Sequence, residues 1–277
     1  LIELFSEEMP PNLQISARTQ FKRLFTESLF SLNLKHQAFE VYSTPTRLVA
    51  FISGLPDKIK ILPTEVKGPK TGVPETVVEN FAKSKGVNVS DLYEKKLEKG
   101  TFYFVKTKGK EINTEDELIK CIPKSLNGIS WKKSMKWSDY DLGWGRPLKS
   151  ILTIFNNKHL KFKYGHIETV NFTLLEEDSE ISQKKVANFD EYKKVLKKNS
   201  IILDHSEREK FILEKIQSIC KNRSFQESIN QSLLIEVSNL VDKPSIIVAQ
   251  FDKNYLKLPR EVIKSTLQTH QRYFTLV

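Results

Sequence analysis

The chain has 277 residues, of which 39% are hydrophobic, with 17 Phe and only 10 Gly. This composition predicts a folded protein with more than one hydrophobic core, and it excludes a disordered tail or a low-complexity scaffold. Lysine and arginine exceed aspartate and glutamate by 44 to 34, and the net charge of +10 favours a polyanionic partner such as nucleic acid. A lysine-rich composition also follows from an AT-rich genome, so the charge alone does not identify the partner.

The first part of the chain predicts a unit of mixed helix and sheet. Residues 13–32 place apolar side chains three and four positions apart after a Pro-Pro pair, which predicts an amphipathic helix. Residues 39–42 and 47–53 predict paired strands around a turn. A helix followed by strands indicates an α+β unit, which we expect at residues 1–62.

The next segment is rich in residues that interrupt helices and strands. Pro and Gly recur through residues 60–75, which predicts a long loop and a domain boundary. Beyond this loop, the pattern predicts a short helix at 76–85, a strand at 101–108 and a helix at 115–127. We therefore expect a loop-rich α+β segment at residues 63–130.

A segment rich in Trp and Lys, residues 131–147, begins the remainder of the chain. The pattern after it predicts strands at 148–155, 160–164 and 245–251, and helices at 189–198, 206–220, 231–241 and 260–271. We expect residues 131–277 to form a third α+β body, and the true chain to continue beyond residue 277, because the sequence stops in mid-pattern. The predicted fold class is α+β, with two or three mixed helix/sheet subdomains.

The Trp- and Lys-rich segment is the strongest local signal for a binding function. Its three tryptophans are interleaved with Lys132, Lys133, Lys136 and Arg146. Flat aromatic rings stack on unpaired bases while cations neutralise phosphates, so the segment is typical of RNA contact. The structural alternative is that the tryptophans pack a core or an interface, with lysines extending to solvent.

No motif in the sequence indicates a catalytic centre or a metal site. The patterns GxGxxG, GxxxxGK[ST], HExxH and GxSxG are absent, and the five histidines never stand at metal-ligand spacing. Two distant cysteines, Cys121 and Cys220, favour a reducing, cytoplasmic setting over a disulfide framework. The longest apolar runs are far shorter than the roughly 18 residues that cross a bilayer, so we expect no membrane partner.

Short motifs along the whole chain resemble those of one family in the same order. They are LIELFSEEMPP at residues 1–11, TPTRL at 44–48, KGP at 67–69, the WxKSM-K-W segment at 131–137, RPL at 146–148, the LLIEV stretch from 233, the segment around residues 251–263, and HQRYF at 270–274. They are similar to the ELxxEExP, TPRRL, KGP, WxKSMRW, RPI/RPL, LLEEVxxLVEWP and HQRYF motifs of the β subunit of bacterial glycyl-tRNA synthetase. One departure is acidic residues 174–180, where that family usually carries a GHRF segment.

The resemblance implies that the chain is the N-terminal portion of a β subunit in a heterotetrameric enzyme. In that family the α subunit makes glycyl-adenylate from glycine and ATP, and the β subunit binds tRNA. The resemblance thus implies the α subunit and the tRNA for glycine as partners, with no DNA. It further implies that ATP and Mg are used by the whole complex, that this chain binds no cofactor, and that HD-type and anticodon-binding domains follow in the complete subunit.

From these arguments we expect no catalytic residue in the chain. The candidate RNA-binding residues are cations in loops or at helix ends, namely Lys67, Lys133, Lys136, Arg146 and Arg272. Arg146 could instead be a structural partner of Asp139 or Asp141. A second hypothesis is that the chain is an assembly scaffold without RNA contact. A third hypothesis, a free-standing hydrolase, requires a catalytic nucleophile next to a general base, and the sequence shows no such pair of residues.

Overall fold

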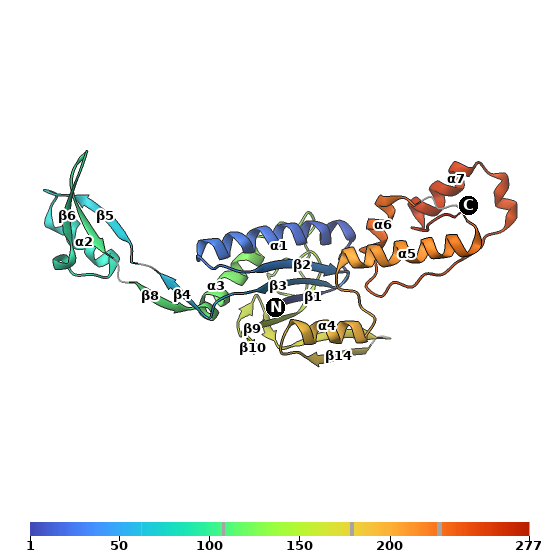
Figure 1. Ribbon diagram of the computed structural model, residues 1–277, viewed down its shortest axis with the longest axis horizontal. Coiled ribbons are helices and arrows are strands. Elements are labelled where there is room, and N and C mark those ends of the chain that lie inside the picture. Colours follow the sequence, from blue (N-terminus) through green and yellow to red (C-terminus); the bar gives the residue numbers. More distant parts are fainter. Residues whose placement is uncertain (62, 107–108, 178–179, 226–228, 277) are drawn as a thin grey trace.

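The computed structural model describes residues 1–61, 63–106, 109–177, 180–225 and 229–276 (Figure 1). Its central body is a seven-stranded sheet with the order β11-β12-β9-β1-β3-β2, in which β10 also pairs with β9. The strands are β1 (Ile2–Ser6), β2 (Ala38–Thr44), β3 (Arg47–Ser53), β9 (Leu148–Phe155), β10 (Lys158–His159), β11 (Lys163–Tyr164) and β12 (Ile167–Val170). Strand β1 lies between β3 and β9 and is antiparallel to both, whereas β12 is parallel to β9.

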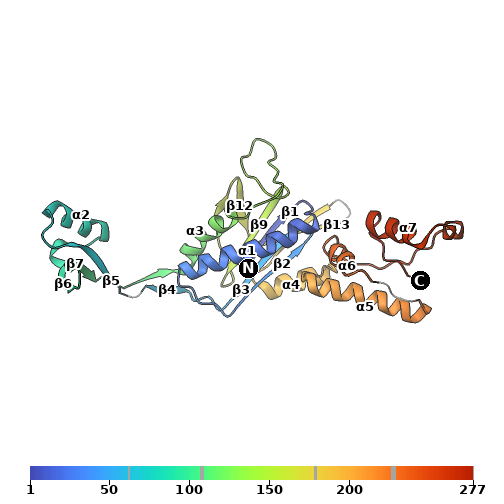
Figure 2. The same cartoon turned by 90° about the horizontal axis from the view of Figure 1, so that it is seen from above.

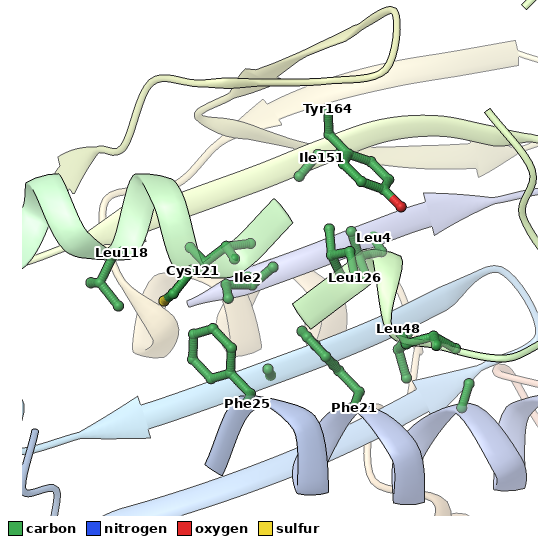
Figure 3. Close-up of a cluster of buried hydrophobic side chains, with 14 of the residues drawn as sticks. Ile2, Leu4, Phe21, Phe25, Leu48, Leu118, Cys121, Leu126, Ile151 and Tyr164 are labelled. Atoms are coloured by element: carbon green, nitrogen blue, oxygen red, sulfur yellow. The ribbon is translucent and has the colours of Figure 1, made fainter. Parts of the chain in front are cut away.

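One face of this sheet is covered by α1 (Pro11–Ser31) and α3 (Thr114–Asn127). Phe21 and Phe25 from α1 and Leu126 from α3 meet Leu4 and Ile151 of the sheet in the main core (Figure 3). These helices form because apolar residues return to the same side every three or four positions. The predicted helices at 13–32 and 115–127 are therefore confirmed.

The opposite face carries a second core. Side chains alternate along a strand, so Val49 and Leu152 point away from α1. They pack against α4 (Phe189–Lys198) and the hairpin formed by β13 (Phe172–Glu177) and β14 (Glu180–Lys185). The predicted helix at 189–198 is confirmed, and its N-cap Asn188 accepts a hydrogen bond from the Glu191 amide at 2.9 Å. Of the acidic departure at residues 174–180, positions 178 and 179 lie outside the described residues.

A small outer lobe is joined to this body by a two-stranded ribbon (Figures 1 and 2). The ribbon is β4 (Lys58–Ile61) paired with β8 (Lys110–Asn113), and the lobe contains β5 (Glu65–Lys70), α2 (Glu75–Lys85), a 3-10 turn (Val89–Asp91), β6 (Tyr93–Leu97) and β7 (Gly100–Lys106). The predicted helix at 76–85 is confirmed as α2, which ends at Gly86 with a φ of 65°. The strand expected at 101–108 is β7, and residues 107–108 lie outside the described part of the chain.

The prediction of a long loop over residues 60–75 is wrong for its central part, which forms β5. This strand tolerates Pro69 because it lies at the edge of the sheet order β5-β7-β6 and has a register shift between Lys67 and Lys70. A proline lacks the amide hydrogen that an inner strand needs, but an edge strand or a bulge does not require it. The Pro and Gly residues of this segment therefore indicate an irregular edge strand and not a loop.

The C-terminal lobe contains α5 (His205–Arg223), α6 (Gln231–Ser238), a 3-10 turn (Lys253–Lys257), α7 (Arg260–Ser265) and a π turn (Thr266–His270). Its small core joins Ile212 and Ile216 of α5 to Leu234 of α6. The strand predicted at 245–251 is wrong, since this segment has no regular structure and the Ile247 side chain is 86% exposed. An apolar run becomes a strand only where a neighbouring strand pairs with it.

The fold is α+β, as predicted, but the folded units cross the expected boundaries. Strands from residues 1–62 and 131–277 share the central sheet, and α3 from residues 63–130 packs on it. The boundary expected at 130/131 thus passes through one folded body, because strand pairing between distant segments builds the sheet. In the part of the chain that the structure describes, no helix combines the length and apolarity that crossing a membrane requires.

Candidate nucleic-acid interface

The segment at residues 131–147 is an extended loop beside β9 and β12, which we call the Trp loop (Figure 2). It is anchored by Trp144, whose side chain is 1% exposed within the main core. The ring of Trp131 lies 4.8 Å from that of Trp144, between centroids, at 60°. Met135 and Trp144 exchange two backbone hydrogen bonds of 2.7 and 3.1 Å, which close the loop.

The close packing inside the Trp loop depends on a residue without a side chain. A Cβ atom at Gly145 would lie 2.5 Å from the Trp131 ring, which is shorter than a van der Waals contact allows. Trp137 is also partly buried against the core. The tryptophans therefore act mainly as anchors, as the structural alternative proposed, and Trp144 is not accessible for stacking on a base.

The cations of the Trp loop remain on its surface. Lys133 is exposed and has no hydrogen bond or ion pair within the described ranges. Lys136 lies 3.2 Å from a carboxylate oxygen of Asp141, with both side chains exposed, so solvent screens this ion pair strongly. Arg146 donates hydrogen bonds to the Met135 sulfur at 3.6 Å and to the Gly145 carbonyl at 3.1 Å.

The structure does not support the alternative in which Arg146 is a structural partner of Asp139 or Asp141. In the described part of the chain, no ion pair joins Arg146 to Asp139 or Asp141. Its guanidinium is half-buried and is held by a sulfur and a backbone carbonyl. Among the described residues these two acceptors bind one terminal nitrogen, Nη1, so the other three N–H groups of the guanidinium make no hydrogen bond to the protein.

The other two candidate cations lie in separate lobes. Lys67 is on β5 of the outer lobe, with its Nζ 3.5 Å from the centroid of the Phe102 ring. Arg272 is in the C-terminal lobe, where its Nε lies 2.7 Å from a Glu236 carboxylate oxygen and its backbone adopts a φ of 58°. The structure therefore brings together Lys133, Lys136 and Arg146 but not all five candidates.

An aromatic pair that no sequence motif marked joins Tyr140 of the Trp loop to His166. Tyr140 stacks on His166 with ring centroids 3.6 Å apart and an interplanar angle of 8°, and the tyrosine is 46% exposed. His166 also meets the edge of Trp137 at 5.6 Å. The only available signal was an aromatic residue among charged ones, which does not reveal the distant histidine that supports it.

Two of the sequence motifs meet in a buried ion pair on the second face of the sheet. Glu3 of the first motif lies 3.3 Å from the Nε of Arg47, which belongs to the TPTRL motif. Thr173 and Tyr192 donate hydroxyl hydrogen bonds to the same carboxylate, and Arg47 donates to the Leu174 carbonyl at 2.5 Å. Burial raises the pKa of Glu3, although the positive charge of Arg47 opposes this effect.

This buried pair is structural in character. Glu3 and Arg47 are 1% and 2% exposed, and their partners come from β13 and α4. A general acid or base must reach a substrate, whereas these groups are enclosed by the protein. Within the described residues, no group of three or more His, Cys, Asp or Glu side chains is placed to hold a metal ion.

The fold and the Trp loop together define an α+β protein with a basic surface loop anchored by tryptophans. The whole chain, residues 1–277, matches the family model described as "Glycyl-tRNA synthetase beta subunit". The chain belongs to this family. It is 32% identical over 278 residues to a glycine–tRNA ligase beta subunit of Rickettsia felis and 32% identical over 276 residues to that of Rickettsia prowazekii. Both alignments cover 100% of this chain but only 42% and 41% of the relatives, so the chain spans about two fifths of their length.

Proposed function

We propose that this chain is the N-terminal body of a glycyl-tRNA synthetase β subunit. In this role it supports the ATP-dependent attachment of glycine to tRNA by binding the tRNA for glycine and the catalytic α subunit in the cytoplasm. The observation that carries the proposal is the family match over residues 1–277. Adenylate formation, with ATP and Mg, belongs to the α subunit in this proposal, and no catalytic residue is assigned to this chain.

The distribution of the candidate cations supports a polyanionic ligand of extended shape. Lys67 lies in the outer lobe, Lys133 in the Trp loop and Arg272 in the C-terminal lobe, and these parts follow one another along the long axis of the molecule (Figure 1). A tRNA carries phosphates along its whole length, so separated contacts can act together. Phosphate contacts position a nucleic acid without reading its sequence.

The second candidate function is an assembly scaffold without RNA contact. Its support is the C-terminal lobe, where large apolar side chains face solvent. Ile247, Leu256 and Tyr255 are 86%, 63% and 59% exposed. Several large apolar side chains exposed in one lobe favour a protein partner there. The two functions predict different responses to salt, because an apolar interface barely responds to salt whereas phosphate contacts weaken steeply as the salt concentration rises.

A competition assay tests the proposal. Excess 277-residue chain is added to a complete α/β glycyl-tRNA synthetase, and the initial rate of tRNA glycylation is measured. We expect inhibition, because the added chain occupies tRNA or the α subunit without supplying catalysis. A chain carrying Lys133→Gln, Lys136→Gln and Arg146→Gln is the matched comparison, since all three residues lie in the Trp loop and none is fully buried.

The way in which inhibition is relieved identifies the ligand. Relief by additional tRNA, with weaker inhibition by the triple variant, supports tRNA binding. Relief by additional α subunit alone, with equal inhibition by the variant, supports the scaffold. If the chain does not inhibit at a concentration about a hundredfold above a typical micromolar dissociation constant, both candidate functions are contradicted. If the chain alone catalyses glycine-dependent pyrophosphate exchange, the assignment of adenylate formation to the α subunit is contradicted.

A further inference from the structure

The three-stranded sheet of the outer lobe has two different faces. Val105 on β7 is 1% exposed and lies on the face that α2 covers. On the same face, a Cβ atom at Gly68 would meet the Phe81 ring of α2 at 2.6 Å, so the helix packs directly on β5. Figure 2 shows α2 on one side of these strands. The hydrophobic core of the outer lobe therefore lies between α2 and this face of the sheet.

The opposite face presents aromatic rings and lysines in alternating positions. The strand register places Phe104 between Lys67 and Tyr93, and Phe102 between Lys70 and Lys95. Phe102 and Phe104 share one face because side chains alternate along β7, and residues paired with them on the neighbouring strands point to the same side. The register shift in β5 keeps Lys67 and Lys70 on this face although they are three positions apart. We call this set the aromatic-lysine face; it consists of Lys67, Lys70, Tyr93, Lys95, Phe102, Phe104 and Lys106.

Contacts within this face hold the cations close to the rings. The Nζ of Lys67 lies 3.5 Å from the centroid of Phe102, and that of Lys95 lies 5.4 Å from the centroid of Phe104. Phe104 is only 6% exposed, because its neighbours cover it. Phe102 is half-buried, and the ammonium of the flexible Lys67 side chain lies over its ring.

The charge of the aromatic-lysine face is strongly positive. Four lysines lie on it, and the register adds one carboxylate, Glu65, opposite Lys106. That carboxylate already pairs with Lys95 at 2.7 Å and accepts the Tyr93 hydroxyl hydrogen bond. The acidic residues of α2, which include Glu75, lie on the covered side of the sheet. The exposed face is therefore complementary to an anionic ligand.

We propose that the aromatic-lysine face binds unpaired nucleotides of RNA. A base replaces the Lys67 ammonium on the Phe102 ring, and the displaced lysine reaches the adjoining phosphate. Sheet surfaces suit this chemistry because ring faces accept any unstacked base while nearby cations neutralise the backbone. An acidic protein segment would use the lysines but would gain little from the flat ring. This site rests on the proposed function and specifies where part of the tRNA would bind.

Binding of a fluorescent single-stranded RNA of about ten nucleotides to the 277-residue chain tests the site, by anisotropy at about 50 and 200 mM salt. Phe102→Leu retains apolar volume but removes the flat ring, and Phe102→Tyr retains the ring. Lys67→Gln removes one cation from the face. Lys83→Gln is the matched control, because Lys83 is an exposed lysine on α2. Circular dichroism melting confirms that each variant is folded.

We expect Phe102→Leu to weaken binding at least about fivefold with an unchanged salt dependence, whereas Phe102→Tyr stays within about twofold. Lys67→Gln should weaken binding and lower the slope of log affinity against log salt by about 0.7. Lys83→Gln should behave as the unaltered chain. The same RNA as a duplex should bind more weakly, since its bases are already stacked.

Three outcomes would overturn the proposal. Equal affinity of Phe102→Leu and the unaltered chain would exclude stacking, and equal affinity for duplex and single strand would exclude recognition of unpaired bases. Competition by polyglutamate at the same charge concentration as RNA would assign the face to an acidic protein segment. If the chain binds tRNA for glycine but these variants do not differ from it, this site is wrong and the proposed function stands. If the chain binds no RNA, both this site and the tRNA binding of the proposed function are wrong.

Discussion

The Glu3 carboxylate and the Arg47 guanidinium form an ion pair of 3.3 Å with side chains 1% and 2% exposed. Glu3 is on β1 and Arg47 on the neighbouring β3, and both face the second core. Arg47 also lies 3.4 Å from Asp242, which follows α6. The pair therefore links the central sheet to the β13–β14 hairpin, to α4 and to the segment that follows α6 in the C-terminal lobe.

Removing the cation of this pair should destabilise the protein strongly. Arg47→Met leaves a buried carboxylate without its counter-charge, and we expect the free energy of unfolding to fall by about 3–5 kcal/mol. Urea denaturation measures this change. Arg23→Met is the control, because Arg23 pairs with Glu27 on the surface, with both side chains more than half exposed, and should cost less than about 1 kcal/mol. Similar losses for the two variants would contradict the structural role of the buried pair.

Arg208 should hold the C-terminal lobe on the central body. Its buried guanidinium donates to the carbonyls of Ser43, Ile202, Leu203 and Ser238 at 2.7–2.9 Å. Arg208→Met leaves these acceptors without their donor, so we expect a loss of about 2–4 kcal/mol in the stability of α5 and α6. Hydrogen exchange should show faster exchange in these helices and little change in β1.

The control for this experiment is on the same helix. Arg223 is exposed near the end of α5, so Arg223→Met should leave exchange unchanged within about 0.5 kcal/mol. Uniformly faster exchange across the whole chain in Arg208→Met would show that Arg208 supports global folding and not specifically the attachment of this lobe.

His205 should make stability depend on pH in the mildly acidic range. Burial and the nearby Arg18 lower the pKa of His205 from 6.5 to about 4. Between these values the unfolded chain binds a proton that the folded chain does not, so this contribution to stability falls as pH falls from about 6.5 to about 4. His205→Asn should reduce the difference in unfolding free energy between pH 7 and pH 4 by about 1–2 kcal/mol, a range lowered for the 30% exposure of the side chain.

Chemical denaturation at a series of pH values measures this effect as a difference between the two proteins, which cancels the titration of the other groups. Parallel stability curves for His205→Asn and the unaltered chain would show that the histidine titrates alike in both states. A steeper loss in the variant would contradict the direction of the pKa shift.

The Trp loop offers a matched pair of glycine substitutions. A methyl group at Gly145 would collide with Trp131 at 2.5 Å, whereas at Gly143 the nearest atom, in Ser134, is 3.9 Å away. We expect Gly145→Ala to cost about 1–3 kcal/mol and to change tryptophan fluorescence, and Gly143→Ala to have little effect. Thermal melting followed by fluorescence measures both. Equal behaviour would mean that Trp131 can move without disturbing the loop.

The sequence predicted correctly those helices whose apolar and polar residues alternate within a single segment of the chain. Helices α1 and α4 are examples, because their buried side chains recur at helical spacing. The segment 245–251 shows the limit of this reasoning, since it is apolar but has no partner strand. The position of β1 between β3 and β9 also depends on pairing between distant segments, which no local period records.

The candidate interface was predictable in its composition and not in its geometry. The Trp loop was identified from its tryptophans and lysines, but only tertiary structure shows that Trp144 lies in the core while Lys133 is exposed. In the outer lobe, alternation predicted the strand that became β7. The register that brings Lys67 over Phe102 could not be predicted, because a bulge in β5 determines it.

Binding of the 277-residue chain to the tRNA for glycine, compared with an unrelated RNA of equal length, tests the central claim most directly. Measurements at about 50 and 200 mM salt should show affinity that falls steeply with salt, as expected for several phosphate contacts, and a preference for the tRNA at both concentrations. Weak binding without preference, or affinity that does not respond to salt, would contradict a role of this chain in tRNA binding.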